Sequence, residues 1–220
     1  MKRKSYHHGK LRAALLSHGV RLLAKEGLAG LSLRKLARQA GVSPAAPYRH
    51  FPTARDLAKA IAADGFQLLR EATLAALGDP ALAALSPLER AGLGYYRFAA
   101  ANPHHLQLMF SGHVRPEAEL PDDPLRQAGE GAFAALMDTI VTEQKAGSVD
   151  ATVDPSTLAM AVWSFSHGFS TLANAGFFAP CAPDEKTPME GLVVASQTLL
   201  KQGWGAKARP AGRTTARTKK

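Results

Sequence analysis

The sequence predicts an all-helical protein, and three observations support this fold class. Apolar residues recur with the period of about 3.6 residues that is typical of amphipathic helices. Alternation of apolar and polar residues never lasts beyond a few positions, and Ala and Leu outnumber the β-branched residues. The 220 residues, 46% of them apolar, can bury a substantial core, as one large domain or as a small module joined to a larger one.

The first third of the chain contains signals for four helices. A first helix is expected over residues 10–26, where leucines share one broad face. A second begins after Ser32, a residue that suits the N-cap, and ends at Gly41. A third is expected over residues 43–50, and a fourth begins after Thr53.

Proline-containing segments divide the rest of the chain into further helices. Several of these segments place Pro directly after Asp, Ser or Asn, which suits the first turn of a helix. The expected spans are 87–101, 103–110, 124–145, 155–175 and 187–202, which makes about nine helices in all. The last two are apolar nearly all round, so they must be covered on two sides, in a deep core or at a subunit interface.

Charge is distributed very unevenly along the chain. Residues 1–60 hold thirteen Lys or Arg against two acidic residues, whereas residues 61–204 hold eight against sixteen. The last sixteen residues add six bases and no acid, which gives the net charge of +9. This distribution favours a nucleic-acid-binding module attached to an acidic body, rather than a generally basic surface.

Several functional classes are disfavoured by what the sequence lacks. A single cysteine, Cys181, excludes internal disulfides and sites built from several thiolates. Without a run of about 18 apolar residues, we expect a cytoplasmic protein with no membrane partner. His104, His105 and His113 are the candidate metal ligands, but adjacent histidines point to different faces of a helix and no carboxylate lies at the matching i+3 or i+4 position, so we expect no metal site. No cofactor is expected. The sequence carries none of the common catalytic motifs, and an enzyme is not expected.

The segment that begins at Leu33 and reads LRKLARQAGVSPAAPYRHF has the dimensions of a helix-turn-helix. Gly41 can adopt the left-handed geometry of the turn, and Ser43 would cap a helix whose free N–H groups enter a major groove. Pro47 lies inside that helix and is expected to shorten or stiffen it. The pattern alone fits an ordinary helical hairpin equally well, and the basic N-terminal quarter favours the helix-turn-helix.

Residues 10–60 resemble the DNA-binding domain of TetR/AcrR-type bacterial transcriptional regulators. The features they share are the motifs LLAKEG, LSLRKLARQAGVS, YRHF and DLAKAI. Trp163, His167 and Gly168 form a W-x-x-x-H-G pattern, which resembles the WHG-type C-terminal domain of this family. The resemblance implies a sequence-specific repressor that binds a palindromic operator in double-stranded DNA as a homodimer. It also implies release by a small-molecule effector.

Four parts are expected along the chain. Residues 1–9 form a basic N-terminal arm, and residues 10–60 form the helix-turn-helix domain. Residues 61–204 form a helical ligand-binding and dimerisation domain, and residues 205–220 have the composition of a disordered basic tail.

The match to the family implies which residues contact DNA. Arg34 is placed to reach a base edge or a phosphate, and Tyr48 and His50 match residues that hold backbone phosphates. The family usually carries Lys or Arg at the position of Ala54, whereas the nearest base here is Arg55. The expected DNA-binding residues are Arg3, Lys4, Ser32, Arg34, Ser43, Ala45, Ala46, Tyr48, Arg49, His50 and Arg55.

Trp163 and His167 are four residues apart and share one helix face. They form either the wall of an effector pocket or a core Trp beside a hydrogen-bonded buried His. Gly168 would let another helix approach closely. The expected pocket residues are Tyr95, Phe98, Met109, Phe110, Phe133, Met137, Trp163 and His167. The expected dimer-interface residues are Phe165, Phe169, Leu192 and Leu199.

A non-specific, architectural DNA-binding protein is the alternative function. Such a protein would bind DNA with an affinity that falls steeply with salt and with little preference between sequences. A dimeric operator-binding protein would instead select a palindrome with half-sites one helical turn or more apart.

Overall fold

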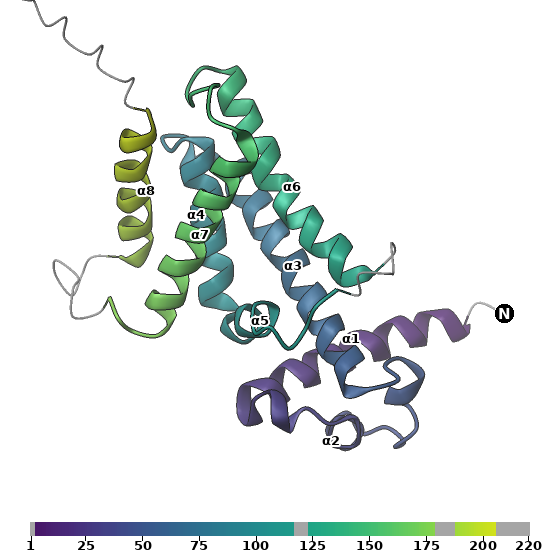
Figure 1. The fold of residues 1–220 in the computed structure, drawn as a ribbon. Helices are drawn as coiled ribbons and strands as arrows, with labels where there is room; N and C mark the ends of the chain where they lie inside the picture. The colour runs from purple at the N-terminus through teal and green to yellow at the C-terminus, as the bar shows by residue number, and fades with distance from the viewer. Residues whose placement is uncertain (1–2, 117–122, 179–187, 206–220) are drawn as a thin grey trace, which may run out of the picture.

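The computed structural model describes residues 3–116, 123–178 and 188–205. Within these ranges the chain forms eight α-helices and three short 3-10 helices, and no strand (Figure 1). In chain order they are α1 Arg3–Glu26, η1 Leu28–Gly30, α2 Leu33–Gln39, η2 Pro47–Arg49, α3 Ala54–Gly78, η3 Pro80–Leu82, α4 Pro87–Ala101, α5 Pro103–Met109, α6 Pro124–Lys145, α7 Pro155–Asn174 and α8 Met189–Gly205. The all-helical prediction is confirmed.

Local capping signals explain why many helices begin and end as expected. α4 and α6 cover the residues predicted for them, and both begin with Pro in the first turn. Thr53 starts α3 with a capping box, in which its hydroxyl accepts from the Asp56 N–H. At the end of α2, Gly41 has a φ of 65°, which lets the Val42 N–H donate to the Ala37 carbonyl. α1 differs, because it begins at Arg3 rather than at residue 10.

The helix expected over residues 43–50 is not an α-helix. Ala46 N–H donates to the Ser43 carbonyl at 2.9 Å, and a 3-10 turn follows over Pro47–Arg49. Pro47 has no N–H to donate, so it interrupts the bonds that would continue an α-helix. The prediction that Pro47 shortens this element is therefore confirmed, and the prediction of a short α-helix up to His50 is wrong. Ser32 occupies the N-cap position of α2, but its side chain makes no capping hydrogen bond.

α3 joins the two ends of the molecule. Its N-terminal part packs with α1, which itself packs with α2, and its remainder packs against α4, α5 and α6, as Figure 1 shows. α7 and α8 lie on the other side of α4. The boundary expected between residues 60 and 61 falls inside this continuous helix.

Three clusters of apolar side chains form the core. The first and largest runs from Leu15 in α1 to Ala128 in α6, so it extends through both ends of the molecule. The second surrounds Ile140, and the third surrounds Phe169 and Val193. None of the described helices is long and apolar enough to cross a membrane.

Two glycines mark how closely the helices pack. A Cβ at Gly94 in α4 would lie 2.7 Å from the carbonyl oxygen of Ala72 and 2.8 Å from Cα of Thr73, both in α3. The absence of a side chain therefore permits the contact between α3 and α4. Gly168 in α7 is different, because its Cβ position has no heavy atom within 4 Å among the described residues, apart from its chain neighbours and the backbone of its own helix. Within the described part of this chain no other helix occupies the space at Gly168, and the prediction that Gly168 lets another helix approach closely stays a prediction for a partner chain.

Candidate DNA interface and ligand pocket

The helix-turn-helix unit is held together by a small apolar core. Leu15 of α1, Leu36 of α2 and Phe51 after η2 are almost fully buried in the first cluster. The Arg12 guanidinium carbon lies 5.5 Å from the centroid of the Phe51 ring, a cation–π contact between α1 and the segment after η2. With Leu33 and Leu36 facing inward, the basic side chains of α2 face outward.

Most of the predicted DNA-binding residues lie at the surface of this unit. The exposed ones are Arg34, Ser43, Ala45, Tyr48, Arg49 and Arg55, and the partly buried ones are Ser32, Ala46 and His50. Tyr48 is 46% exposed, which is high for an aromatic ring. Arg3 and Lys4 lie in the first turn of α1, and their side chains are outside the described part of the structure.

An ion pair in this unit was not predicted from the sequence. Lys35 Nζ donates to Glu26 Oε2, which links α2 to the end of α1. This hydrogen bond is the main cause that lowers the pKa of Glu26. The nine-residue separation gives no local signal, since the pair depends on how α1 and α2 cross.

α5 packs against α3 and also contacts α1 of the helix-turn-helix unit. His105 Nε2 in α5 lies 3.4 Å from a carboxylate oxygen of Asp64 in α3. A Cβ at Gly65 would lie 2.5 Å from Sδ of Met109, so α5 rests directly on α3. Val114 is buried in the first cluster and lines a small hollow with residues of η1 and α3. None of these contacts was predicted.

A pocket with aromatic walls lies between α3, α4, α6 and α7. Its empty volume is about 410 Å³, part of it open to solvent. Tyr95, Phe133 and Trp163, all predicted pocket residues, line it. The complete lining is Leu69, Thr73, Ala91, Gly92, Tyr95, Ala132, Phe133, Leu136, Val162, Trp163 and Ser166. No charged side chain is among these residues.

His167 lies behind this wall and is hydrogen-bonded to it. Its Nδ1 is 2.9 Å from the Tyr95 hydroxyl, and its ring centroid is 4.4 Å from that of Phe110. Burial lowers the pKa of His167, which favours the neutral imidazole. Burial also raises the pKa of Tyr95, which therefore keeps its proton. Trp163 thus borders the pocket, while His167 is a hydrogen-bonded histidine next to it.

The other predicted pocket residues lie elsewhere. Phe98 and Met109 are buried in the first core cluster and do not line the pocket. Met137 packs against the second cluster. Phe110 contacts the Trp163 ring at 6.1 Å between centroids and is 38% exposed.

Comparisons with known proteins match both ends of the molecule. A family model described as "Bacterial regulatory proteins, tetR family" matches residues 15–61. A second model, "Tetracyclin repressor-like, C-terminal domain", matches residues 88–195. The solved structure of a protein of unknown function from Rhodococcus sp. RHA1 is 32% identical, with a TM-score of 0.75, and the match covers 92% of this chain and 100% of that chain. The chain belongs to the TetR family.

Two other solved structures share the fold of this TetR-family chain. A bacterial regulatory protein of the tetR family from Rhodococcus RHA1 is 19% identical, with a TM-score of 0.64 over 90% of this chain and 98% of that one. The transcriptional regulator FadR from Bacillus subtilis, in complex with stearoyl-CoA, is 16% identical, with a TM-score of 0.62 over 87% and 98%. A comparison with curated proteins gives no match.

Membership of the family settles the broad activity. The chain is a DNA-binding transcriptional regulator, and TetR-type regulators are not enzymes. In the described residues no three His, Cys, Asp or Glu side chains are grouped as metal ligands would be. Cys181 and the basic segment over residues 206–220 lie outside the described part of the chain.

The residues predicted for the dimer interface of this TetR-family regulator differ in exposure. Phe169 is buried in the third cluster, where its ring contacts those of Phe165 and Phe178 in tilted arrangements. Leu192 is partly buried in the same cluster. Leu199 is 68% exposed on α8, so it has the most surface to offer a partner.

Proposed function

We propose that this TetR-family regulator is a homodimeric repressor that binds a palindromic operator and is released by a small-molecule effector. One observation carries the proposal: Arg34, Tyr48 and Arg49 are exposed on a strongly basic helix-turn-helix unit. Arg can form two parallel hydrogen bonds with guanine, and a Tyr hydroxyl can donate to a phosphate. A repressor of this kind acts on chromosomal DNA, so we also propose that it works in the cytoplasm.

An apolar outer surface on α7 and α8 supports the proposed homodimer. Met160, Leu172 and Leu199 are large apolar side chains that are exposed in the single chain. A second copy that packs α7 and α8 against the first would cover them. Two helix-turn-helix units related by a two-fold axis then require an operator with the same symmetry.

The aromatic pocket is the proposed effector site. Its hydroxyl groups are already engaged, because Thr73 Oγ1 donates to the Leu69 carbonyl and Ser166 Oγ to the Val162 carbonyl. The effector therefore gains most of its affinity from apolar and aromatic contact with Phe133 and Trp163. An uncharged, largely apolar molecule fits this lining. FadR from Bacillus subtilis, which has the same fold, was solved with stearoyl-CoA, and this supports ligand binding by the fold.

Selection of bound DNA from a random pool at physiological salt tests the DNA-binding part of the proposal. We expect enrichment of an inverted repeat whose half-sites lie about one helical turn or more apart. An unenriched pool with binding intact would instead support an architectural DNA-binding protein.

One variant and its control distinguish contact with a base from non-specific electrostatic attraction to DNA. Arg34→Ala is expected to weaken operator binding by roughly 1–3 kcal/mol per half-site. It should also relax the preference for one base at one position of each half-site. Arg70→Ala is the matched control, because Arg70 is an exposed arginine far along α3. An equal loss on all sequences for Arg34→Ala would identify a phosphate contact instead.

Sedimentation tests the homodimer. Leu199→Glu places a charge on the proposed interface and is expected to give monomers that lose the operator. Leu74→Glu is the control, since Leu74 is an exposed leucine on α3. A Leu199→Glu protein that stays dimeric would remove α8 from the interface.

A further inference from the structure

Two residues with aliphatic hydroxyl groups line the aromatic pocket, Thr73 in α3 and Ser166 in α7. Thr73 Oγ1 lies 2.9 Å from the Leu69 carbonyl oxygen, and Ser166 Oγ lies 2.9 Å from the Val162 carbonyl oxygen. A carbonyl has no proton, so each hydroxyl donates its single proton to that bond. Each hydroxyl oxygen keeps a lone pair, and towards a ligand it can therefore act only as an acceptor.

The Tyr95 hydroxyl offers no free proton either. Its oxygen lies 2.9 Å from Nδ1 of His167, and the Trp163 side chain is a second hydrogen-bond donor to it. If the oxygen accepted from both rings, the buried Tyr95 proton would have no partner, so that proton belongs in the bond to Nδ1. The indole of Trp163 has a single N–H, which this contact uses. The polar side chains that line the pocket thus hold acceptors and no unengaged donor.

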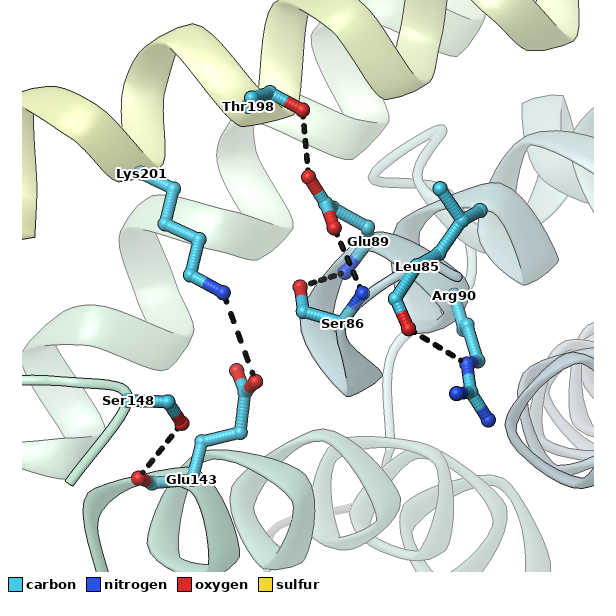
Figure 2. A network of polar contacts seen from close by, with 8 residues as sticks. All are labelled: Leu85, Ser86, Glu89, Arg90, Glu143, Ser148, Thr198 and Lys201. Carbon is cyan, nitrogen blue, oxygen red and sulfur yellow. Dashed lines mark hydrogen bonds and ion pairs between the residues drawn. The ribbon is translucent and has the colours of Figure 1, made fainter. Parts of the chain in front are cut away.

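The charged groups of the neighbouring region are held outside the pocket. Figure 2 shows Glu89 of α4 hydrogen-bonded at 2.6 Å to Thr198 of α8, and Lys201 Nζ of α8 3.8 Å from Glu143 Oε1 of α6. None of these four residues lines the aromatic pocket. A charged ligand would be buried there without an opposite charge, which is strongly unfavourable. The pocket therefore favours a neutral ligand.

The aromatic walls favour a ligand with a donor group. The rings of Phe133 and Trp163 lie 5.4 Å apart between centroids and are tilted by 35°. The face of an aromatic ring is negative, so it attracts N–H and O–H groups and repels carbonyl oxygens. Ala91 and Gly92 of α4 and Ala132 of α6 are small, and the empty volume of about 410 Å³ has room for a fused bicyclic molecule.

We propose that the aromatic pocket selects a neutral aromatic molecule whose polar group is a hydrogen-bond donor, an N–H or O–H, rather than an acceptor. This inference rests on the proposed function, in which the pocket is the effector site. The ligand donates to Ser166 Oγ or Thr73 Oγ1, and its ring lies against Phe133 and Trp163. A ligand carbonyl would pair with either hydroxyl only if that hydroxyl gave up its bond to the helix backbone, so no hydrogen bond would be gained.

Three bicyclic probes of similar size test this selectivity. Indole carries one N–H donor, benzofuran has an oxygen in place of that N–H, and 1-indanone carries a carbonyl acceptor. Calorimetry on the full-length protein without DNA measures their affinities. We expect indole to bind about fivefold more tightly than benzofuran and about tenfold or more tightly than 1-indanone. Benzofuran is more hydrophobic than indole, so tighter binding of indole requires a partner for its N–H. Indole that binds no more tightly than benzofuran overturns the proposal.

The tryptophan signals locate the bound probe. The chain has two tryptophans, Trp163 and Trp204, so the spectrum of 15N-labelled Trp204→Phe assigns the Nε1–H signal of Trp163. We expect indole to shift this signal. Ala132→Phe fills the pocket and should abolish indole binding. Indole that binds without moving the Trp163 signal, or that binds Ala132→Phe undiminished, lies elsewhere and contradicts the proposal.

Substitution of the two hydroxyl groups tests the acceptors directly. Thr73→Val and Ser166→Ala remove one hydroxyl each, and the carbonyls that these hydroxyls contact keep their helix hydrogen bonds. The double variant should bind indole and benzofuran equally. Thr139→Val in α6 is the matched control, because Thr139 is buried, donates to the Ala135 carbonyl at 2.8 Å and does not line the pocket. A double variant that keeps the wild-type preference for indole contradicts the proposal. If it does not fold, at least one single variant must lose most of that preference.

Operator binding separates this inference from the proposed function. If indole binds as expected but leaves the affinity for the operator unchanged, the donor selectivity stands and the pocket is not the effector site. If the three probes bind equally well, the donor selectivity is wrong and the pocket remains the proposed effector site. If none of them binds up to its solubility limit, both proposals fail.

Discussion

The contact between α3 and α4 makes Gly94→Ala a sharp test of the packing. At a solvent-exposed position in the middle of a helix, a Gly→Ala change would stabilise the protein by up to about 1 kcal/mol, since Ala has the higher helix propensity. At Gly94 the new Cβ would lie 2.7 Å from the carbonyl oxygen of Ala72 and 2.8 Å from Cα of Thr73. Both atoms belong to backbone, so the helices must separate, and such overpacking costs about 1–3 kcal/mol. We expect a net loss of about 1–2 kcal/mol in the free energy of unfolding.

Thermal unfolding followed by far-UV circular dichroism measures this effect. For a chain of this length the loss corresponds to a Tm about 2–8 °C lower. Gly129→Ala in α6 is the control, because its Cβ would meet only the Phe66 ring at 4.0 Å. We expect the control to raise the Tm slightly, by about 1–4 °C. All proteins are compared at one concentration, since self-association would make the Tm depend on it. A Gly94→Ala protein as stable as the wild type would refute the close contact.

Three other changes have defined outcomes. Thr53→Ala removes the capping box of α3 and should lower the free energy of unfolding by about 1 kcal/mol in urea titrations. Tyr95→Phe removes the hydrogen bond to His167 and should lower the free energy of unfolding by about 1 kcal/mol in the same titrations. The affinity for the operator should not change. His167→Asn should make the free energy of unfolding fall less steeply as the pH is lowered. Since burial lowers the folded-state pKa of His167 below 6.5, its contribution is complete above that pH and is lost as the pH falls and the unfolded chain takes up a proton. If the free energy of unfolding of His167→Asn falls as steeply with decreasing pH as that of the wild type, this prediction is contradicted.

Helix limits in this chain follow local signals, and local signals are readable in the sequence. Ser86 before Pro87 at α4, and Asp123 before Pro124 at α6, mark starts that the structure has at the same residues. The element after Ser43 shows the limit of this reasoning. The sequence shows that Pro47 lacks an N–H, but whether an α-helix survives depends on how the next residues pack. Phe51 is buried in the core at that point, and the chain follows a 3-10 turn.

The pocket was harder to predict because it depends on contacts between distant segments. Helical periodicity identifies an apolar face but not which part of that face borders an empty space. Tyr95 and Phe98 are one turn apart in α4, yet Tyr95 lines the aromatic pocket and Phe98 is fully packed. Gly92 and Gln197 are more than a hundred residues apart, so nothing local connects them. Their contact exists only because α4 and α8 pack side by side.

The contacts between the aromatic pocket and the helix-turn-helix unit form one continuous packed path. The Trp163 ring, which lines the pocket, touches Phe110, and Phe110 touches Phe66 of α3 at 5.7 Å between ring centroids. Phe66 belongs to the same buried cluster as Leu57 and Leu15, which support the helix-turn-helix unit. Densely packed interiors transmit small displacements rather than absorb them. Under the proposed function, a molecule that enters the pocket and moves Trp163 would act on this packed path, which runs along the continuous helix α3 into the helix-turn-helix unit.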